Sequence, residues 1–208
     1  MKGKLGLLAL LSLIVTVGGV YATWTFAEGN TSTADTTVNV GMTGVEHKGA
    51  KGTLAVMIMG DGGYTLAIDD ADNNHKPDIK TAGVVTVTFK PNDDAPESVK
   101  TEGIDVKLYV TYASKDNTVA TLEAWQYDGT QIFDIDTTSS NAIHLDNEDA
   151  SYADGVFTWT VSHTQIGISL HDGFENKVID TQAKYDALNA ELNKGSFKLM
   201  VEECIDHA

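Results

Sequence analysis

The stretch IDVKLYVTY, residues 104–112, carries the clearest strand pattern in the chain. Apolar or aromatic side chains fall at every second position and point one way: Ile104, Val106, Leu108, Val110 and Tyr112. Between them, Asp105, Lys107, Tyr109 and Thr111 point the other way. Such alternation is typical of a β-strand with one face on a core and one face in water. The stretch therefore predicts a sheet with one buried and one solvated face.

Similar short segments recur along the rest of the chain. They are rich in β-branched and aromatic residues and are bounded by Gly, Asp, Asn or Ser. We expect strands within residues 37–42, 53–59, 64–68, 84–89, 118–127, 131–135, 142–145, 156–161, 166–170 and 197–205. About ten short strands, with turn signals between them, indicate an all-β antiparallel sandwich or barrel.

One helix is expected near the C-terminus, over QAKYDALNAEL at 182–192. Its apolar residues recur at helical spacing, Asp180 or Thr181 can cap its start, and Lys194 with Gly195 suits its end. We expect this helix to lie across one end of the sandwich. By contrast, PNDDAPES at 91–98 is interpreted as an exposed loop.

The first 22 residues have the features of a secretion signal. Lys2 and Lys4 precede an apolar run over 5–17, and Val20 and Ala22 are small enough for a signal peptidase. Cleavage is predicted between Ala22 and Thr23. The alternative is an uncleaved anchor, although the run is short for the ~20 residues of a spanning helix. We divide the chain into a signal peptide (1–22), an N-terminal segment (23–36) and a β-sandwich domain (37–208).

The charge of the chain limits its partners. Removing Lys2 and Lys4 leaves 12 lysines against 30 acidic residues, a net charge of −18, and the sequence contains no arginine. Such a chain is a poor ligand for nucleic acid or for an acidic membrane surface. Cys204 is the only cysteine, so no disulfide can form within the chain, and we expect it to be a small buried residue of the terminal strand.

No catalytic motif stands out. The six histidines make no recognised metal-ligand spacing, and no nucleophile elbow, phosphate-binding loop or dinucleotide fingerprint is present. We therefore predict no catalytic residues and a protein that is not an enzyme.

A partial calcium-binding pattern lies in DDADNNHKPD, residues 69–78. Asp70, Asp72, Asn74 and Asp78 fall at positions 1, 3, 5 and 9 of an EF-hand-like loop. However, His75 stands where that loop needs Gly, and Thr81 stands where it needs Glu. An ordinary polar hairpin loop is the favoured interpretation. No cofactor is predicted, with weak Ca²⁺ binding as the alternative.

Both ends of the chain resemble one family. Gly18, Gly19, Ala22 and Trp24 look like the SipW-dependent class of signal peptide. The order of strand VFTWTV (156–161), helix TQAKYDALNAELNKG and closing strand SFKLMVEE resembles the C-terminal part of the TasA and camelysin family of secreted biofilm matrix proteins.

The resemblance implies a jelly-roll sandwich that Gram-positive bacteria export and assemble into extracellular fibres. It implies a signal peptidase of the SipW type as processing partner. In such fibres the mature N-terminal segment adds as a strand to the next subunit. Some members are described as metalloproteases, but this sequence lacks the ligand spacing for that activity.

The leading hypothesis is a structural subunit of an extracellular or cell-surface filament. Thr23, Trp24, Thr25 and Phe26 would form the polymerisation strand between copies of this chain, with no membrane partner after cleavage. The alternative is a secreted carbohydrate-binding or adhesive module, in which Trp125 and Trp159 could contribute to a sugar platform. A secreted enzyme ranks third, and fold alone does not separate these classes.

Overall fold

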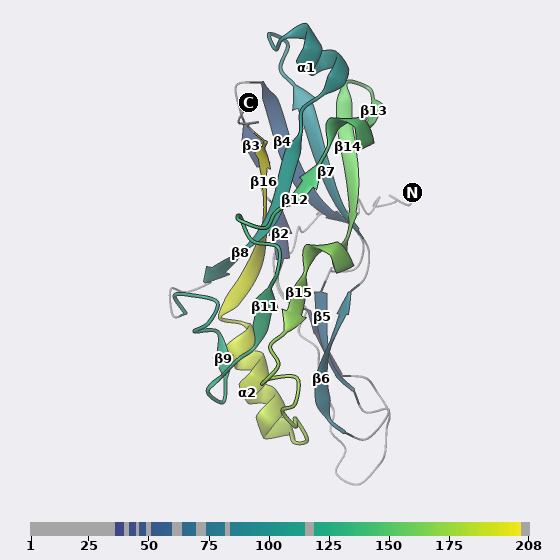
Figure 1. Cartoon of the computed structure of the whole chain (residues 1–208). Coiled ribbons are helices and arrows are strands. Elements are labelled where there is room, and N and C mark those ends of the chain that lie inside the picture. The colour runs from purple at the N-terminus through teal and green to yellow at the C-terminus, as the bar shows by residue number, and fades with distance from the viewer. Residues whose placement is uncertain are drawn as a thin grey trace, which may run out of the picture.

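The computed structural model describes residues 36–39, 42–44, 46–48, 51–59, 64–69, 74–81, 84–114 and 119–204. Over these residues the chain is mostly β and forms several antiparallel sheets, as predicted (Figure 1). None of these sheets closes into a barrel within the described residues. The predicted signal peptide and the predicted polymerisation strand lie outside the described residues.

The larger sheet has five antiparallel strands in the order β13-β14-β7-β4-β3. The strands span Ser151–Ala153 (β13), Val156–Ser162 (β14), Val84–Pro91 (β7), Gly52–Met59 (β4) and Glu46–Lys48 (β3). On β7 and β14 every second side chain is buried, as the alternation in the sequence predicts. The buried faces of these strands meet the core.

The second sheet has four strands in the order β12-β8-β16-β2. They span Ile143–Leu145 (β12), Val106–Ser114 (β8), Gly195–Glu203 (β16) and Met42–Gly44 (β2). Strand β16, the last of the chain, pairs antiparallel with β8 and parallel with β2. The predicted strand over 37–42 is thus divided: Met42 belongs to β2, whereas β1 (Thr36–Asn39) pairs in another sheet.

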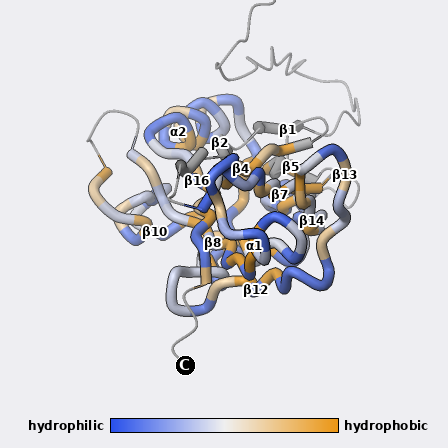
Figure 2. Tube along the Cα trace, turned by 90° about the horizontal axis from the view of Figure 1, so that it is seen from above, coloured by the Kyte–Doolittle hydropathy of each residue, from blue (hydrophilic) through white to orange (hydrophobic). Residues whose placement is uncertain are grey.

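Buried residues of both sheets belong to one hydrophobic core. Seen from above, β8 and β16 lie on one side of the molecule, and β7 and β14 on the other (Figure 2). Tyr109 departs from the predicted alternation, because it is only 7% exposed although it shares the outer face of β8 with Lys107. Its hydroxyl donates a hydrogen bond to Glu202, which raises the pKa of Tyr109 to about 12.

Smaller sheets and the predicted helix lie in the lower half of the molecule as drawn in Figure 1. Strands β5 (Tyr64–Asp69) and β6 (Lys76–Thr81) form a sheet with β1, and β9 (Gln126–Tyr127) pairs with β10 (Thr130–Gln131). Strand β11 (Phe133–Ile135) pairs with β15 (Ile168–Leu170). Helix α2 spans Gln182–Leu192, the predicted bounds, and the Thr181 side chain accepts a hydrogen bond from the Lys184 backbone N–H at 3.3 Å.

Three predictions of local structure need correction. Of the strand predicted at 118–127, the structure describes 119–127, and within that range only 126–127 is β. Residues 121–124 form a turn in which the N–H of Ala124 donates to the Thr121 carbonyl. The loop predicted at 91–98 runs into a short helix, α1 (Glu97–Glu102), which follows Pro96. Strand β6 was not predicted, and its Pro77 is tolerated because β6 is an end strand of its sheet.

Two 3₁₀ turns complete the described chain, η1 (Asn147–Asp149) and η2 (His163–Ile166). No helix among the described residues has the length and apolar character to cross a membrane.

Candidate functional site

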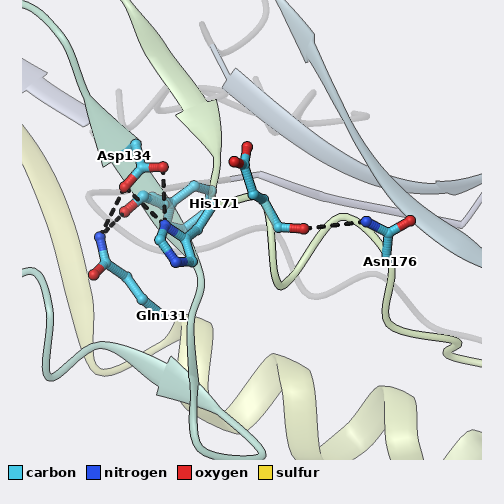
Figure 3. A network of polar contacts seen from close by, with 6 residues as sticks. Gln131, Asp134, His171 and Asn176 are labelled. Carbon is cyan, nitrogen blue, oxygen red and sulfur yellow. Dashed lines mark hydrogen bonds and ion pairs between the residues drawn. The ribbon is translucent and has the colours of Figure 1, made fainter.

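A network of polar side chains gathers where β11 begins and β15 ends (Figure 3). Asp134 lies on β11, and His171 directly follows β15, whose Leu170 pairs with Phe133. This register brings His171 Nδ1 to 3.1 Å from Asp134 Oδ1 and 3.0 Å from Oδ2. Gln131 Nε2 donates to Asp134 Oδ1 at 3.0 Å and to the Phe133 carbonyl at 2.6 Å. The carboxylate of Asp134 therefore holds two side chains.

Backbone hydrogen bonds fix the same turn in place. The N–H of His171 donates to the Ile132 carbonyl at 3.0 Å, and the His171 carbonyl accepts from Phe174 N–H at 2.7 Å. Further along the turn, Asn176 Nδ2 donates to the Asp172 carbonyl at 3.2 Å (Figure 3), and Asn176 Oδ1 accepts from Lys76 Nζ at 3.0 Å. The network thus connects β11, the segment after β15 and the start of β6.

An aspartate on Nδ1 is the arrangement that orients a histidine ring as a general base, provided that a nucleophile lies at the other nitrogen. Both side chains are partly exposed. Within the described part of the chain, Asp134 supplies the only side-chain hydrogen bond to the His171 ring. The contact between Asp134 and His171 attaches the turn after β15 to β11, and we call this pair the Asp134–His171 clamp.

Sequence reasoning did not find this pair. Asp134 and His171 are 37 residues apart and share no motif spacing. The only usable signal was indirect, since both residues lie in or beside predicted strands, 131–135 and 166–170. Predicting that these two short strands pair would have brought the side chains together.

Of the four predicted calcium ligands, Asn74 and Asp78 are among the described residues, and of these two only Asp78 lies in a strand. Asn74 Oδ1 accepts a hydrogen bond from the Lys76 backbone N–H at 2.9 Å, and Asp78 lies within β6, opposite Ala67. Strands β5 and β6 pair antiparallel up to Asp69 and Lys76, so the hairpin interpretation is confirmed. Asp70 and Asp72 lie outside the described residues. No group of three or more His, Cys, Asp or Glu side chains that could hold a metal occurs among the residues described, and weak calcium binding stays a prediction.

The two tryptophans proposed for a sugar platform are in the core. Trp125 is 0% exposed and Trp159 is 3% exposed. Each indole N–H donates to a backbone carbonyl, Trp125 to Glu191 at 2.7 Å and Trp159 to Asp146 at 2.8 Å. Neither ring can stack on a sugar, so their assignment to such a platform is wrong.

Two further titratable groups have defined surroundings. His163, in η2, is 1% exposed, and burial lowers its pKa below the ordinary value of 6.5. Cys204 directly follows β16 and is partly rather than fully buried, with Sγ 3.6 Å from His144 Nδ1. Its backbone N–H donates to the Asp105 carbonyl at 2.9 Å, which ties the end of the chain to the segment before β8.

One aromatic side chain at the edge of the larger sheet is more than half exposed. Tyr152, on the end strand β13, is 56% exposed. Strands β13 and β14 form a tight hairpin in which Asp154 and Gly155 adopt φ of +52° and +77°. Positive φ at both turn residues is typical of the type I′ turn that joins strands by two residues. The hairpin presents Tyr152 at an outer edge of the larger sheet.

The residues of the predicted cleavage site, Ala22 and Thr23, lie outside the described residues, as do Trp24, Thr25 and Phe26 of the polymerisation strand. Comparisons of the chain with models of protein families, with curated proteins and with solved structures found no match.

Proposed function

We propose that the protein is a structural subunit of an extracellular filament of the biofilm matrix or cell surface. The observation that carries this proposal is the half-exposed tyrosine on β13, which is an end strand of the larger sheet among the described residues. A sheet edge of this kind can pair with an extended segment of another chain through main-chain hydrogen bonds. We also propose that the two larger sheets form the jelly-roll sandwich implied by the family resemblance.

The complementary element is the predicted mature N-terminus. Cleavage after Ala22 by a signal peptidase of the SipW type leaves Trp24 and Phe26 alternating with threonines. Each large aromatic left in water forgoes on the order of 1.5–3 kcal/mol of burial. A strand that inserts into a neighbouring copy recovers this free energy. Because donor and acceptor are different surfaces, the contact is head-to-tail and extends into an open filament.

The proposal is tested by removing the donor segment. Secreted protein should begin with Thr-Trp-Thr-Phe on N-terminal sequencing, and the mature chain should form uniform fibres by negative-stain microscopy. A variant lacking residues 23–30 should stay soluble and unassembled. A synthetic peptide of residues 23–30, added to the intact protein, should inhibit fibre growth.

A matched pair of variants separates the aromatic side chains from the backbone. Replacing Trp24 and Phe26 together by serine should abolish assembly, whereas replacing Thr23 and Thr25 together by serine should leave it intact. Fibres of normal appearance from the chain that lacks residues 23–30 would show that the N-terminal segment is not the donor.

A further inference from the structure

The outer edge of β13 has backbone groups available for pairing. Ala153 and Val156 flank the two-residue turn, and Tyr152 pairs with Phe157 as the next position. In such hairpins the flanking pair exchanges hydrogen bonds and the next pair does not. The N–H and C=O of Tyr152 therefore point away from β14, toward a side where no described strand lies.

A row of large apolar side chains crosses the sheet and ends at this edge. In the strand register, Leu54 lies opposite Phe89, Phe89 opposite Phe157, and Phe157 opposite Tyr152. The Phe89 and Phe157 ring centroids are 6.2 Å apart, and those of Phe157 and Tyr152 are 4.6 Å apart. The first three members are buried, whereas Tyr152 is not. An added strand would place its own side chain beside Tyr152 and continue the row.

Charge favours one occupant of this edge. Glu148, Asp149 and Asp154 flank β13 and are exposed. The predicted mature terminus carries an α-ammonium group on Thr23, and no acidic residue follows before Glu28. An α-amino group is mostly protonated at neutral pH, since its ordinary pKa is about 7.7–8.0. A cationic, aromatic strand thus complements an acidic edge that ends in an aromatic.

In the four-stranded sheet, the end strand whose side chains are described is less suitable. Strand β12 ends the smaller sheet with Ile143 half-buried and Leu145 buried, and it carries no aromatic residue. Resting on the proposed function, we propose that the outer edge of β13 (Ser151–Ala153) is the acceptor for residues 23–27 of a neighbouring copy, with Tyr152 contacting Trp24 or Phe26.

The first experiment measures assembly of the full mature chain with Tyr152→Lys. We expect a roughly two- to twelvefold higher concentration for half-maximal fibre formation, because the variant loses an aromatic pair worth roughly 0.5–1.5 kcal/mol. The matched control is Met57→Lys, since Met57 is also about half exposed, at 49%, but lies within β4. Normal assembly of the Tyr152→Lys variant, with an unchanged thermal midpoint, would overturn the proposal.

The second experiment identifies the neighbour directly. A photoreactive benzoylphenylalanine replaces Tyr152 in the mature chain, and crosslinked peptides from irradiated assemblies are sequenced by mass spectrometry. The expected product joins position 152 to residues 23–27 of another copy. A link to residues 151–153 of another copy would indicate edge-to-edge pairing instead, and a link elsewhere would also reject this acceptor.

The two variants distinguish failure of the acceptor from failure of the proposed function. If the chain lacking residues 23–30 does not assemble while Tyr152→Lys assembles normally, donation stands and the acceptor lies elsewhere. If both assemble normally, the N-terminal segment is not the donor and this acceptor is rejected with it. Absence of fibres from the intact mature chain is the outcome that rejects the proposed function.

Discussion

Two rows of aromatic side chains differ in how they end. At the helical end, Trp125 packs on Tyr112, Phe133 and Phe197 with ring centroids 5.0–5.5 Å apart, and α2 accepts the indole hydrogen bond through the Glu191 carbonyl. At the rim, the row from Phe89 through Phe157 stops at exposed Tyr152. We call the rings around Trp125 the closed row, because α2 covers them and their packing stabilises the fold. We call the rings from Phe89 to Tyr152 the open row, because no described element covers Tyr152 and its ring is left as a contact surface.

The largest effect is expected at the closed row. Trp125→Ala should destabilise the fold by about 3–5 kcal/mol, because it removes a fully buried indole and leaves a cavity among three rings. The free energy of unfolding from urea titration measures this. Trp125→Phe, which keeps a ring but loses the hydrogen bond to Glu191, should cost less. A cost below that of Tyr152→Ala would remove the distinction between the rows.

Gly195→Ala tests how tightly the closed row is packed. A Cβ at this position would lie 2.5 Å from Tyr112 Cε2 and 3.1 Å from Trp125 Cδ2. Moving these rings should cost roughly 1–3 kcal/mol of unfolding free energy. Gly129→Ala is a contrasting variant in which a Cβ would meet nothing within 4 Å, so only its positive φ resists the change. If Gly195→Ala and the wild type unfold with equal free energy, the closed row is less tightly packed than the distances to Tyr112 and Trp125 indicate.

Thr181→Ala tests the start of α2, the helix that covers the closed row. The Thr181 side chain accepts from the Lys184 N–H, so its loss should cost about 1 kcal/mol. Thr181→Ser retains the hydroxyl and serves as the control. Urea titration of both variants should show a loss only for alanine.

His163 lies in η2, the turn that connects β14 to β15. Strand β14 contributes Phe157 to the open row, and β15 pairs with β11, which contributes Phe133 to the closed row. Burial lowers the pKa of its folded state, so the unfolded chain takes up the proton first as pH falls. Stability should be complete above about pH 6.5 and decline below it. His163→Leu should flatten this part of the pH profile. Parallel profiles for His163→Leu and wild type would contradict the assignment.

The smallest effect on stability is expected at the open row. Tyr152→Ala should change the unfolding free energy by about 1 kcal/mol or less, since the ring is more than half exposed and contacts Phe157 alone among described aromatics. The same variant should impair assembly. A large loss of stability would mean that Tyr152 completes the monomer core rather than an interface.

Local sequence patterns predicted those elements whose side chains alternate or repeat without interruption. Strands β4, β7, β14 and helix α2 are examples, because their burial follows period two or the helical period. The pattern failed where local chemistry competed with it. Residues 118–127 look like a strand by composition, yet Thr121 closes a turn through both its carbonyl and its hydroxyl.

Local sequence patterns could not predict which segments far apart in the chain pair with each other. The parallel pairing of β2 with β16 joins residues 42–44 to 197–199, and no signal in either segment specifies the other. The Asp134–His171 clamp depends in the same way on the pairing of β11 with β15. The exposure of Tyr152 follows from the place of β13 at the end of its sheet, and the burial of Trp125 from its contacts with α2 and neighbouring rings, neither of which single-strand alternation determines. The burial of Trp159, by contrast, follows the alternation of β14.

The position of β16 has a consequence for the order of events during folding. The last strand among the described residues, it lies inside its sheet, between β8 and the early strand β2. A chain emerging N-terminus first therefore cannot complete the four-stranded sheet until residues 195–203 are available. Pairings of such large sequence separation close slowly, because the loop entropy is lost before the contacts form. The four-stranded sheet is thus expected to form late, whereas the five-stranded sheet, whose last strand β14 ends at Ser162, does not wait for β16.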